Sequence, residues 1–207
     1  MNAEEANPDE MPWPIAGDKL FASDTDWWHN ACLNFASNKW DAYATGYKEA
    51  ADIIVERVVE TQRGMDTLIY PVAFLYRHYL ELRLKELILS GQELVDAPAD
   101  LKHVHRIDIL WSSTRQLLER IWPTGSKTDL GAVGECINEF CQFDQQSMSF
   151  RYPVTKDGSP TLPDVKHINL RHLAEVMGRI ASLLDSASMG ISAYLDEKHT
   201  YSGDNYQ

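Results

Sequence analysis

The chain has 207 residues and a net charge of −12, from 31 acidic and 19 basic side chains. This length is enough for one sizeable core and short for two, and the acidic balance argues against non-specific binding to duplex DNA, which depends on Lys and Arg displacing phosphate counterions. The sequence has no secretory signal and no run of about 18 apolar residues that could span a membrane. It therefore predicts a cytoplasmic protein without membrane attachment.

The first 23 residues are predicted to form an acidic, proline-containing arm. Residues 1–26 hold seven acidic side chains and one basic side chain, Lys19, so about half of the excess negative charge lies there. Proline disfavours regular secondary structure in such a segment. Apolar side chains such as Trp13 and Phe21 allow part of the arm to pack on the body of the protein.

Residues 24–197 are predicted to form one helical domain, followed by a polar tail at 198–207. Apolar residues recur there at steps of three and four, which is the spacing of one helix face. Capping residues, glycine and proline mark the expected ends, with Gly91 as the stop of the second helix. The expected helices cover residues 27–63, 67–90, 105–122, 130–146 and 170–196, and a break near Ser37-Asn38 is an alternative for the first.

The helical period is lost between the fourth and fifth predicted helices. Residues 150–155 and 161–162 flank Asp157-Gly158, a tight-turn sequence. This pattern predicts a short β-hairpin or an irregular excursion. The expected fold class is therefore all-α, a five-helix up-and-down bundle with this excursion before the last helix.

A line of charge runs along the second predicted helix, where Arg77, Glu81 and Lys85 recur every four residues among apolar neighbours. Buried charges are costly unless they are paired, so the line indicates a structural ion-pair network or a binding site. In the structural alternative, Glu81 pairs with Arg77 or Lys85 and also accepts a contact from Arg151. In the binding alternative, these four residues and Tyr152 hold an anionic ligand.

Three short motifs resemble a known family. Glu81-x-x-x-Lys85 resembles the Glu-Lys-Ala-Leu-Lys element of HEPN (higher eukaryotes and prokaryotes nucleotide-binding) domains. His105 at the start of the third helix and Arg151-Tyr152-Pro153 before the last helix are similar to motifs that follow in that order there. The resemblance covers roughly residues 65–190. It implies a HEPN-like bundle that forms a homodimer in a stress, toxin–antitoxin or phage-defence system, with a nucleotide, RNA or a partner protein as its ligand.

The nuclease members of that family carry an Arg followed by a His four to six residues later, and no arginine of this chain has a His at that offset. A metal-independent RNase needs a cation to stabilise the charged phosphorane and a base or acid beside it. We therefore expect a non-catalytic or degenerate module. The alternatives are an RNase with a rearranged site built from Arg77, His78, Arg151 and His172, and a structural partner subunit whose acidic arm docks elsewhere.

No cofactor and no metal site are predicted. The sequence lacks the glycine-rich phosphate loops, the Gly-x-Ser-x-Gly nucleophile motif and the His-Glu-x-x-His zinc motif. The pair His103 and His105 has no carboxylate or thiol nearby at a spacing that would complete a zinc site. Three cysteines without Cys-x-x-Cys spacing are typical of reduced thiols.

Overall fold

The computed structural model describes residues 13–23, 25–101 and 104–203. The chain divides into two compact units, Met1–Ser37 and Asn38–Gln207. The first unit contains one short 3-10 helix in its described residues, η1 (Trp27–His29). The prediction of a helix that begins at residue 27 is therefore wrong for the first turns of that helix.

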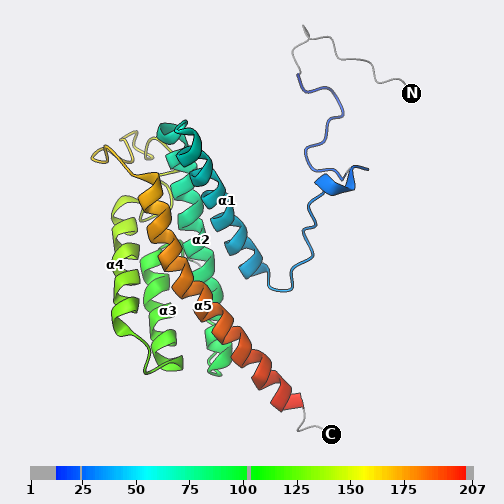
Figure 1. Ribbon diagram of the computed structural model, residues 1–207, viewed down its shortest axis with the longest axis vertical. Coiled ribbons are helices and arrows are strands. Elements are labelled where there is room, and N and C mark those ends of the chain that lie inside the picture. Colours follow the sequence, from blue (N-terminus) through cyan, green and yellow to red (C-terminus); the bar gives the residue numbers. More distant parts are fainter. Residues whose placement is uncertain (1–12, 24, 102–103, 204–207) are drawn as a thin grey trace. The chain divides into compact units, whose positions relative to one another are not determined.

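The second unit contains five α-helices in its described residues (Figure 1). Their bounds are α1 (Lys39–Thr61), α2 (Met65–Leu94), α3 (Ile107–Ile121), α4 (Lys127–Phe143) and α5 (Leu170–Gly203). Helix α1 begins after Asn38, whose side-chain oxygen accepts a hydrogen bond from the Asp41 amide at 3.2 Å. This N-cap satisfies a free amide of the first turn and explains the break at this point. The predicted all-α class is confirmed.

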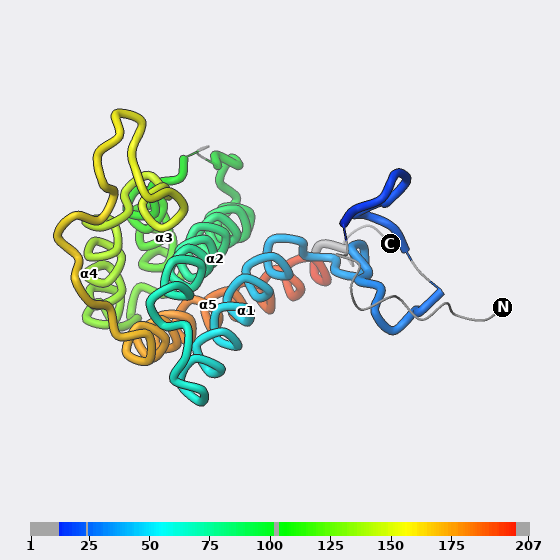
Figure 2. Tube along the Cα trace, turned by 90° about the horizontal axis from the view of Figure 1, so that it is seen from above, coloured from blue at the N-terminus to red at the C-terminus, as the bar shows by residue number. Residues whose placement is uncertain are grey.

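Helix α2 is the central helix of the second unit. It packs against α1, α3 and α5, and Figure 2 shows it between α1 and α3. A helix surrounded in this way needs apolar side chains on most of its circumference, and α2 supplies buried residues such as Tyr76, Leu80, Leu84 and Leu87. The charged line of α2 therefore lies next to the core.

The segment between α4 and α5 is irregular, which confirms the second of the two predicted alternatives; the first, a β-hairpin, is wrong. Its described residues contain a single isolated bridge, between Val154 and Pro160. The turn lies where the sequence predicts it, since Gly158 has a φ of 86° and the Thr155 amide donates to the Ser159 carbonyl at 2.9 Å. Pro153 and Pro160 have no N–H to donate, so the ladder does not extend into strands.

Two helices run past their predicted ends. Helix α2 passes through Gly91 and ends at Leu94, while α5 continues beyond residue 196 to Gly203. The Lys198 ammonium on α5 donates to the Glu93 carbonyl at 3.0 Å and the Leu94 carbonyl at 3.2 Å. A cation at these carbonyls caps α2 and gives the last turns of α5 a tertiary contact.

A search for membrane spans in the described part of the chain finds no helix that combines the necessary length with the necessary apolar character.

Candidate functional site

Arg77 on α2 is completely buried, and its guanidinium binds two segments of backbone. Nη2 donates to the carbonyl of His105 at 2.6 Å and to that of Gln145 at 3.3 Å. Nε donates to the carbonyl of Asp144 at 3.1 Å. Nη1 lies 3.4 Å from the Glu81 carboxylate. Arg77 therefore fastens α2 to the residues before α3 and after α4, and it has no open face for a ligand.

Glu81 is the carboxylate at the centre of this network and is 2% exposed. Its Oε1 accepts a hydrogen bond from the Lys85 ammonium at 2.7 Å and lies 2.9 Å from Nδ1 of His105. Burial by itself raises the pKa of Glu81, but the hydrogen bonds from Lys85 and His105 outweigh it and hold that pKa below its ordinary value. The His105 side chain is 73% exposed, so the network reaches the surface there.

Asp144 completes the network from the end of α4, and it is also fully buried. Its Oδ1 accepts hydrogen bonds from the amides of Met148 at 2.6 Å and Ser149 at 3.0 Å. Its Oδ2 lies 3.4 Å from Nε of Arg77 and has no hydrogen-bond partner, so the second contact is electrostatic. Asp144 thus fixes the first turn of the excursion and balances the buried cation.

Arg151 does not pair with Glu81, and this part of the structural prediction is wrong. Its guanidinium lies over the ring of Phe74 at 5.5 Å and over that of Tyr152 at 5.4 Å. Its Nη1 donates to the carbonyl of Ser147 at 3.3 Å. These cation–π contacts attach the excursion to the side of α2.

His78 follows Arg77 in sequence but lies between aromatic rings. Its ring packs edge-on against Tyr47 with centroids 4.4 Å apart, and it stacks on Phe74 at 5.7 Å. Burial lowers the pKa of His78 below its ordinary value. Tyr47, His78, Phe74, Arg151 and Tyr152 therefore form one connected series of rings and a cation, which we call the aromatic ladder.

The four residues of the rearranged RNase alternative are not assembled into one site. Arg77 faces the interior, whereas His78 contacts Phe74 by ring stacking and Arg151 contacts it by a cation–π interaction. His172 is exposed in the first turn of α5, where its backbone amide donates to the Asn169 side chain at 3.0 Å. No interaction joins His172 to Arg77, His78 or Arg151, and the structure describes all four residues.

A second buried network surrounds Arg83, which the sequence analysis did not identify. The Arg83 guanidinium, 3% exposed, lies 2.8 Å from Asp41 of α1, 3.1 Å from Glu86 of α2 and 2.9 Å from Asp185 of α5. Burial opposes the charged form, but these carboxylates hold the pKa of Arg83 above its ordinary value. The three-residue spacing of Arg83 and Glu86 was a local signal for this pair. Asp41 and Asp185 gave none, because they approach only in the folded chain.

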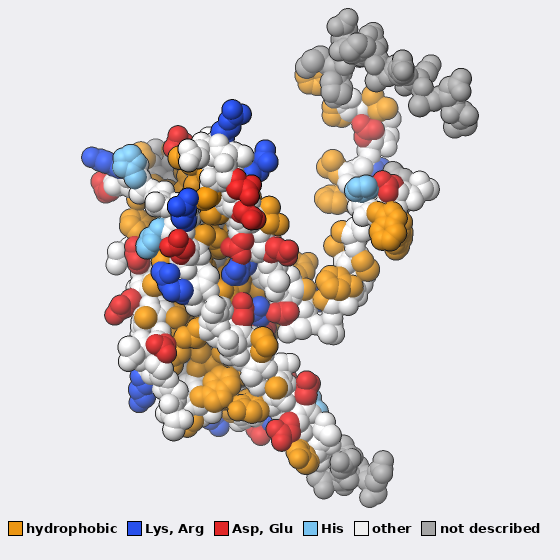
Figure 3. Space-filling model, in the orientation of Figure 1, with side chains coloured by type: hydrophobic (Ala, Val, Ile, Leu, Met, Phe, Trp, Pro, Cys, Tyr) orange, Lys and Arg blue, Asp and Glu red, His pale blue; other side chains and the backbone are white. Residues whose placement is uncertain are grey.

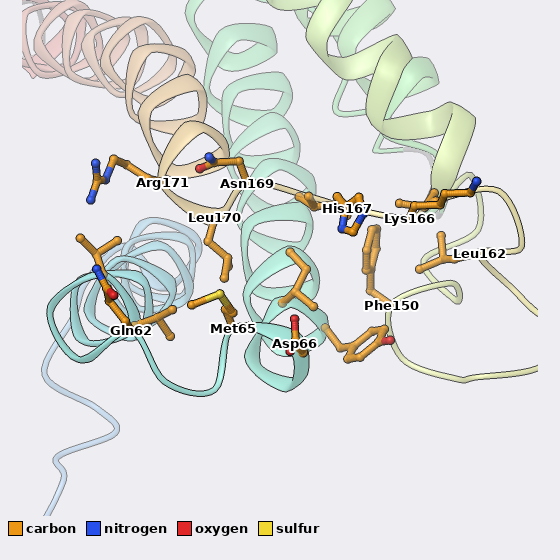
Figure 4. Close-up of a pocket in the computed structure, with 16 residues that line it drawn as sticks. Gln62, Met65, Asp66, Phe150, Leu162, Lys166, His167, Asn169, Leu170 and Arg171 are labelled. Carbon is orange, nitrogen blue, oxygen red and sulfur yellow. The ribbon is translucent and has the colours of Figure 1, made fainter.

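A cleft of about 750 Å³ lies where α1 ends, α2 begins and the residues before α5 pass by (Figure 4). We call it the junction cleft. Its walls combine apolar residues such as Val58 and Leu170 with the polar residues Asp66, Lys166 and Arg171. A smaller cavity of about 320 Å³ lies between α4 and α5 and is lined mainly by apolar side chains.

The described residues contain no group of three or more His, Cys, Asp or Glu side chains arranged to hold a metal ion. His103 lies outside the described residues. The three cysteines are free thiols, and Cys32 is exposed.

Comparisons with family models, with curated proteins and with solved structures found no match to this chain. The resemblance to HEPN domains therefore depends on the sequence motifs, and it stays a prediction.

Proposed function

We propose that this chain is a non-catalytic helical module that acts by protein association, with its N-terminal unit as the docking element. The observation that carries this proposal is the exposure of large apolar side chains in that unit (Figure 3). Phe21 is 98% exposed and Trp28 is 92% exposed. The exposed set consists of Trp13, Ile15, Leu20, Phe21, Trp27, Trp28, Leu33 and Phe35.

Burial by a partner would stabilise these side chains. Full burial of one large apolar side chain contributes about 1.5–3 kcal/mol relative to leaving it in water. Acidic residues interleave with the apolar ones, since residues 1–26 hold seven acidic side chains against Lys19. Alternation of acidic and apolar residues is typical of segments that become ordered on binding. The matching surface on a partner is an apolar groove flanked by basic side chains.

The buried position of Arg77 supports the non-catalytic part of the proposal. A cation that stabilises a phosphoryl transition state must touch the reacting group, and Arg77 donates instead to backbone carbonyls inside the protein. The HEPN resemblance, with its homodimers and partner subunits of stress and defence systems, agrees with an association role.

The association test compares two double variants of the full chain. Trp27→Ser with Trp28→Ser removes two exposed rings of the N-terminal unit, and Ile53→Ser with Met189→Ser removes two exposed apolar side chains of the helical unit. The wild type and the two variants are each used to capture partners from the source cell extract. Each captured partner is then purified and titrated against these three forms. We expect the first variant alone to lose at least about ten-fold in affinity, the effect of 1.4 kcal/mol. Equal affinities for the three forms would contradict the proposal.

RNA or nucleotide binding is a second candidate, which the aromatic ladder favours. Tyr152 is 46% exposed and stands beside the exposed Arg151, and bases stack on aromatic rings and guanidinium planes. Fluorescence anisotropy with a single-stranded RNA tests this candidate. Tyr152→Ala should weaken binding, while Tyr43→Ala on α1 serves as a control for loss of one exposed ring. RNA cleavage by the wild type that His78→Phe abolishes would instead support the RNase alternative.

A further inference from the structure

The junction cleft has an apolar floor and an apolar mouth. Val58, Phe150 and Leu170 are 3%, 8% and 6% exposed, and they line the cleft from α1, the excursion and α5. Met65 and Tyr70 of α2 also line it and are 44% and 49% exposed. Figure 4 shows the side chains of Met65 and Leu170 pointing toward each other. A ligand that covers exposed apolar groups at the mouth of a cleft removes them from water, which favours binding.

Basic side chains also line this cleft. Lys166 and His167 lie on the segment that leads into α5 and Arg171 lies in the first turn of α5, whereas Asp66 lies in the first turn of α2 (Figure 4). No ion pair or side-chain hydrogen bond engages these four residues within the described part of the chain. With His167 neutral, two cations and one anion leave the cleft with a charge of +1, in a chain whose net charge is −12.

We propose that the junction cleft binds a small amphipathic organic acid, whose apolar body lies against the floor and whose carboxylate pairs with Arg171. The cleft volume of about 750 Å³ is within the range of about 300–1,000 Å³ typical of small-molecule sites. Arginine holds carboxylates through two parallel hydrogen bonds, and Arg171 lines this cleft from the first turn of α5. This site goes beyond the association role, because all its lining residues belong to the helical unit.

Two pairs of probes test the charge and the apolar body separately. Octanoate and octan-1-ol share a chain, as do 3-phenylpropanoate and 3-phenylpropan-1-ol, and each pair differs in the carboxylate. Calorimetric titration of the full chain should give binding of at least one acid that is about ten-fold or more tighter than that of its alcohol, because only the acid forms charge-assisted hydrogen bonds with Arg171. Alcohols binding as tightly as the acids, or no binding of either acid at millimolar concentration, would overturn the proposal.

A matched pair of variants tests the position of the carboxylate. Arg171→Glu reverses a charge in the cleft, and Arg179→Glu reverses the charge of an exposed residue on the same helix outside the cleft. We expect Arg171→Glu to abolish the difference between acid and alcohol and Arg179→Glu to preserve it. Both changes are at exposed positions, so thermal midpoints close to the wild-type value will show that the two variants are folded.

Methyl NMR of the methionines shows where the acid binds. Met65 lines the junction cleft, whereas Met177 lines the cavity between α4 and α5. We expect the Met65 methyl resonance to shift on titration, and the affinity derived from this shift to equal the calorimetric affinity. A shift of Met177 with Met65 unchanged would assign the ligand to the other cavity and overturn the proposal.

Discussion

Arg77 carries its charge in the interior because every side of its guanidinium has an acceptor. We expect Arg77→Met to lower the free energy of unfolding by about 3–5 kcal/mol, since it leaves the buried carboxylates of Glu81 and Asp144 without their cation. Urea unfolding at pH 7 measures this loss. Arg151→Met is the matched control: it removes an exposed guanidinium held by cation–π contacts and should cost about 1 kcal/mol or less. Equal losses in the two variants would contradict the role of Arg77.

His78 should make stability depend on pH in a narrow window. Burial among aromatic rings lowers its pKa in the folded protein below the ordinary value of 6.5, so the unfolded chain takes up this proton at a higher pH than the folded protein does. Stability is then complete above pH 6.5 and falls as the pH drops through the lowered pKa. Glu81 also has a lowered pKa, but its stabilising effect is lost only below its ordinary value of 4.5.

The variant His78→Phe separates these two contributions. It keeps an aromatic ring between Tyr47 and Phe74 and removes the titrating group. We expect the free energy of unfolding of this variant to change less between pH 7.5 and about 5 than that of the wild type, while both lose stability in more acidic solution. Urea titrations at a series of pH values test this difference. The same slope in both proteins would exclude His78 as its source.

Two glycines inside helices should respond to alanine in opposite ways. A Cβ on Gly134 of α4 would lie 2.7 Å from Nε1 of the buried Trp111 on α3, closer than side chains approach one another. We expect Gly134→Ala to destabilise the protein by about 1–3 kcal/mol. On Gly91 of α2 the nearest atom to a Cβ is 3.5 Å away, so Gly91→Ala should stabilise by about 0.5–1 kcal/mol through helix propensity. Thermal unfolding measures the stability of both variants. A thermal midpoint of Gly91→Ala below that of the wild type would contradict the presence of space for a Cβ at this position.

The helices were predictable from sequence because their apolar period repeats over many residues. Local signals were less reliable where tertiary contacts decide the outcome. Trp27-Trp28 follows Asp26, a good capping residue, yet forms only a 3-10 turn. The Asp26 side chain makes no cap hydrogen bond there, and no residue of the turn is buried. Gly91 has the composition of a helix end, but the chain remains helical to Leu94, where Lys198 from the other end of the sequence binds the free carbonyls.

In the candidate site, contacts between residues close in sequence were predictable, and contacts between distant segments were not. The four-residue spacing of Arg77, Glu81 and Lys85 predicts the two ion pairs that the structure contains. This spacing contains no information on His105, which contacts Glu81 from another segment. The junction cleft likewise gave no pattern, since its walls come from segments as distant as Val58 and Arg171.

The division of the chain into two units predicts that the helical unit folds alone. Its buried core residues all lie between Ala44 and Ile191, and the large apolar side chains of the described N-terminal residues are exposed. We expect a fragment of residues 38–207 to keep the helical content of the full chain and a thermal midpoint within about 2 °C, because removal of exposed residues changes stability by about 0.5 kcal/mol or less. Circular dichroism and calorimetry test this. A large fall in the midpoint would mean that the first 37 residues contribute to the folded core.

The contacts of Arg77 also have a consequence for how the protein opens. One guanidinium binds the carbonyl of His105, just before α3, and those of Asp144 and Gln145, just after α4. Both ends of the α3–α4 hairpin are therefore held by the same side chain. Release of either end weakens the hold on the other, so the amide protons of α3 and α4 should exchange with solvent in one cooperative opening.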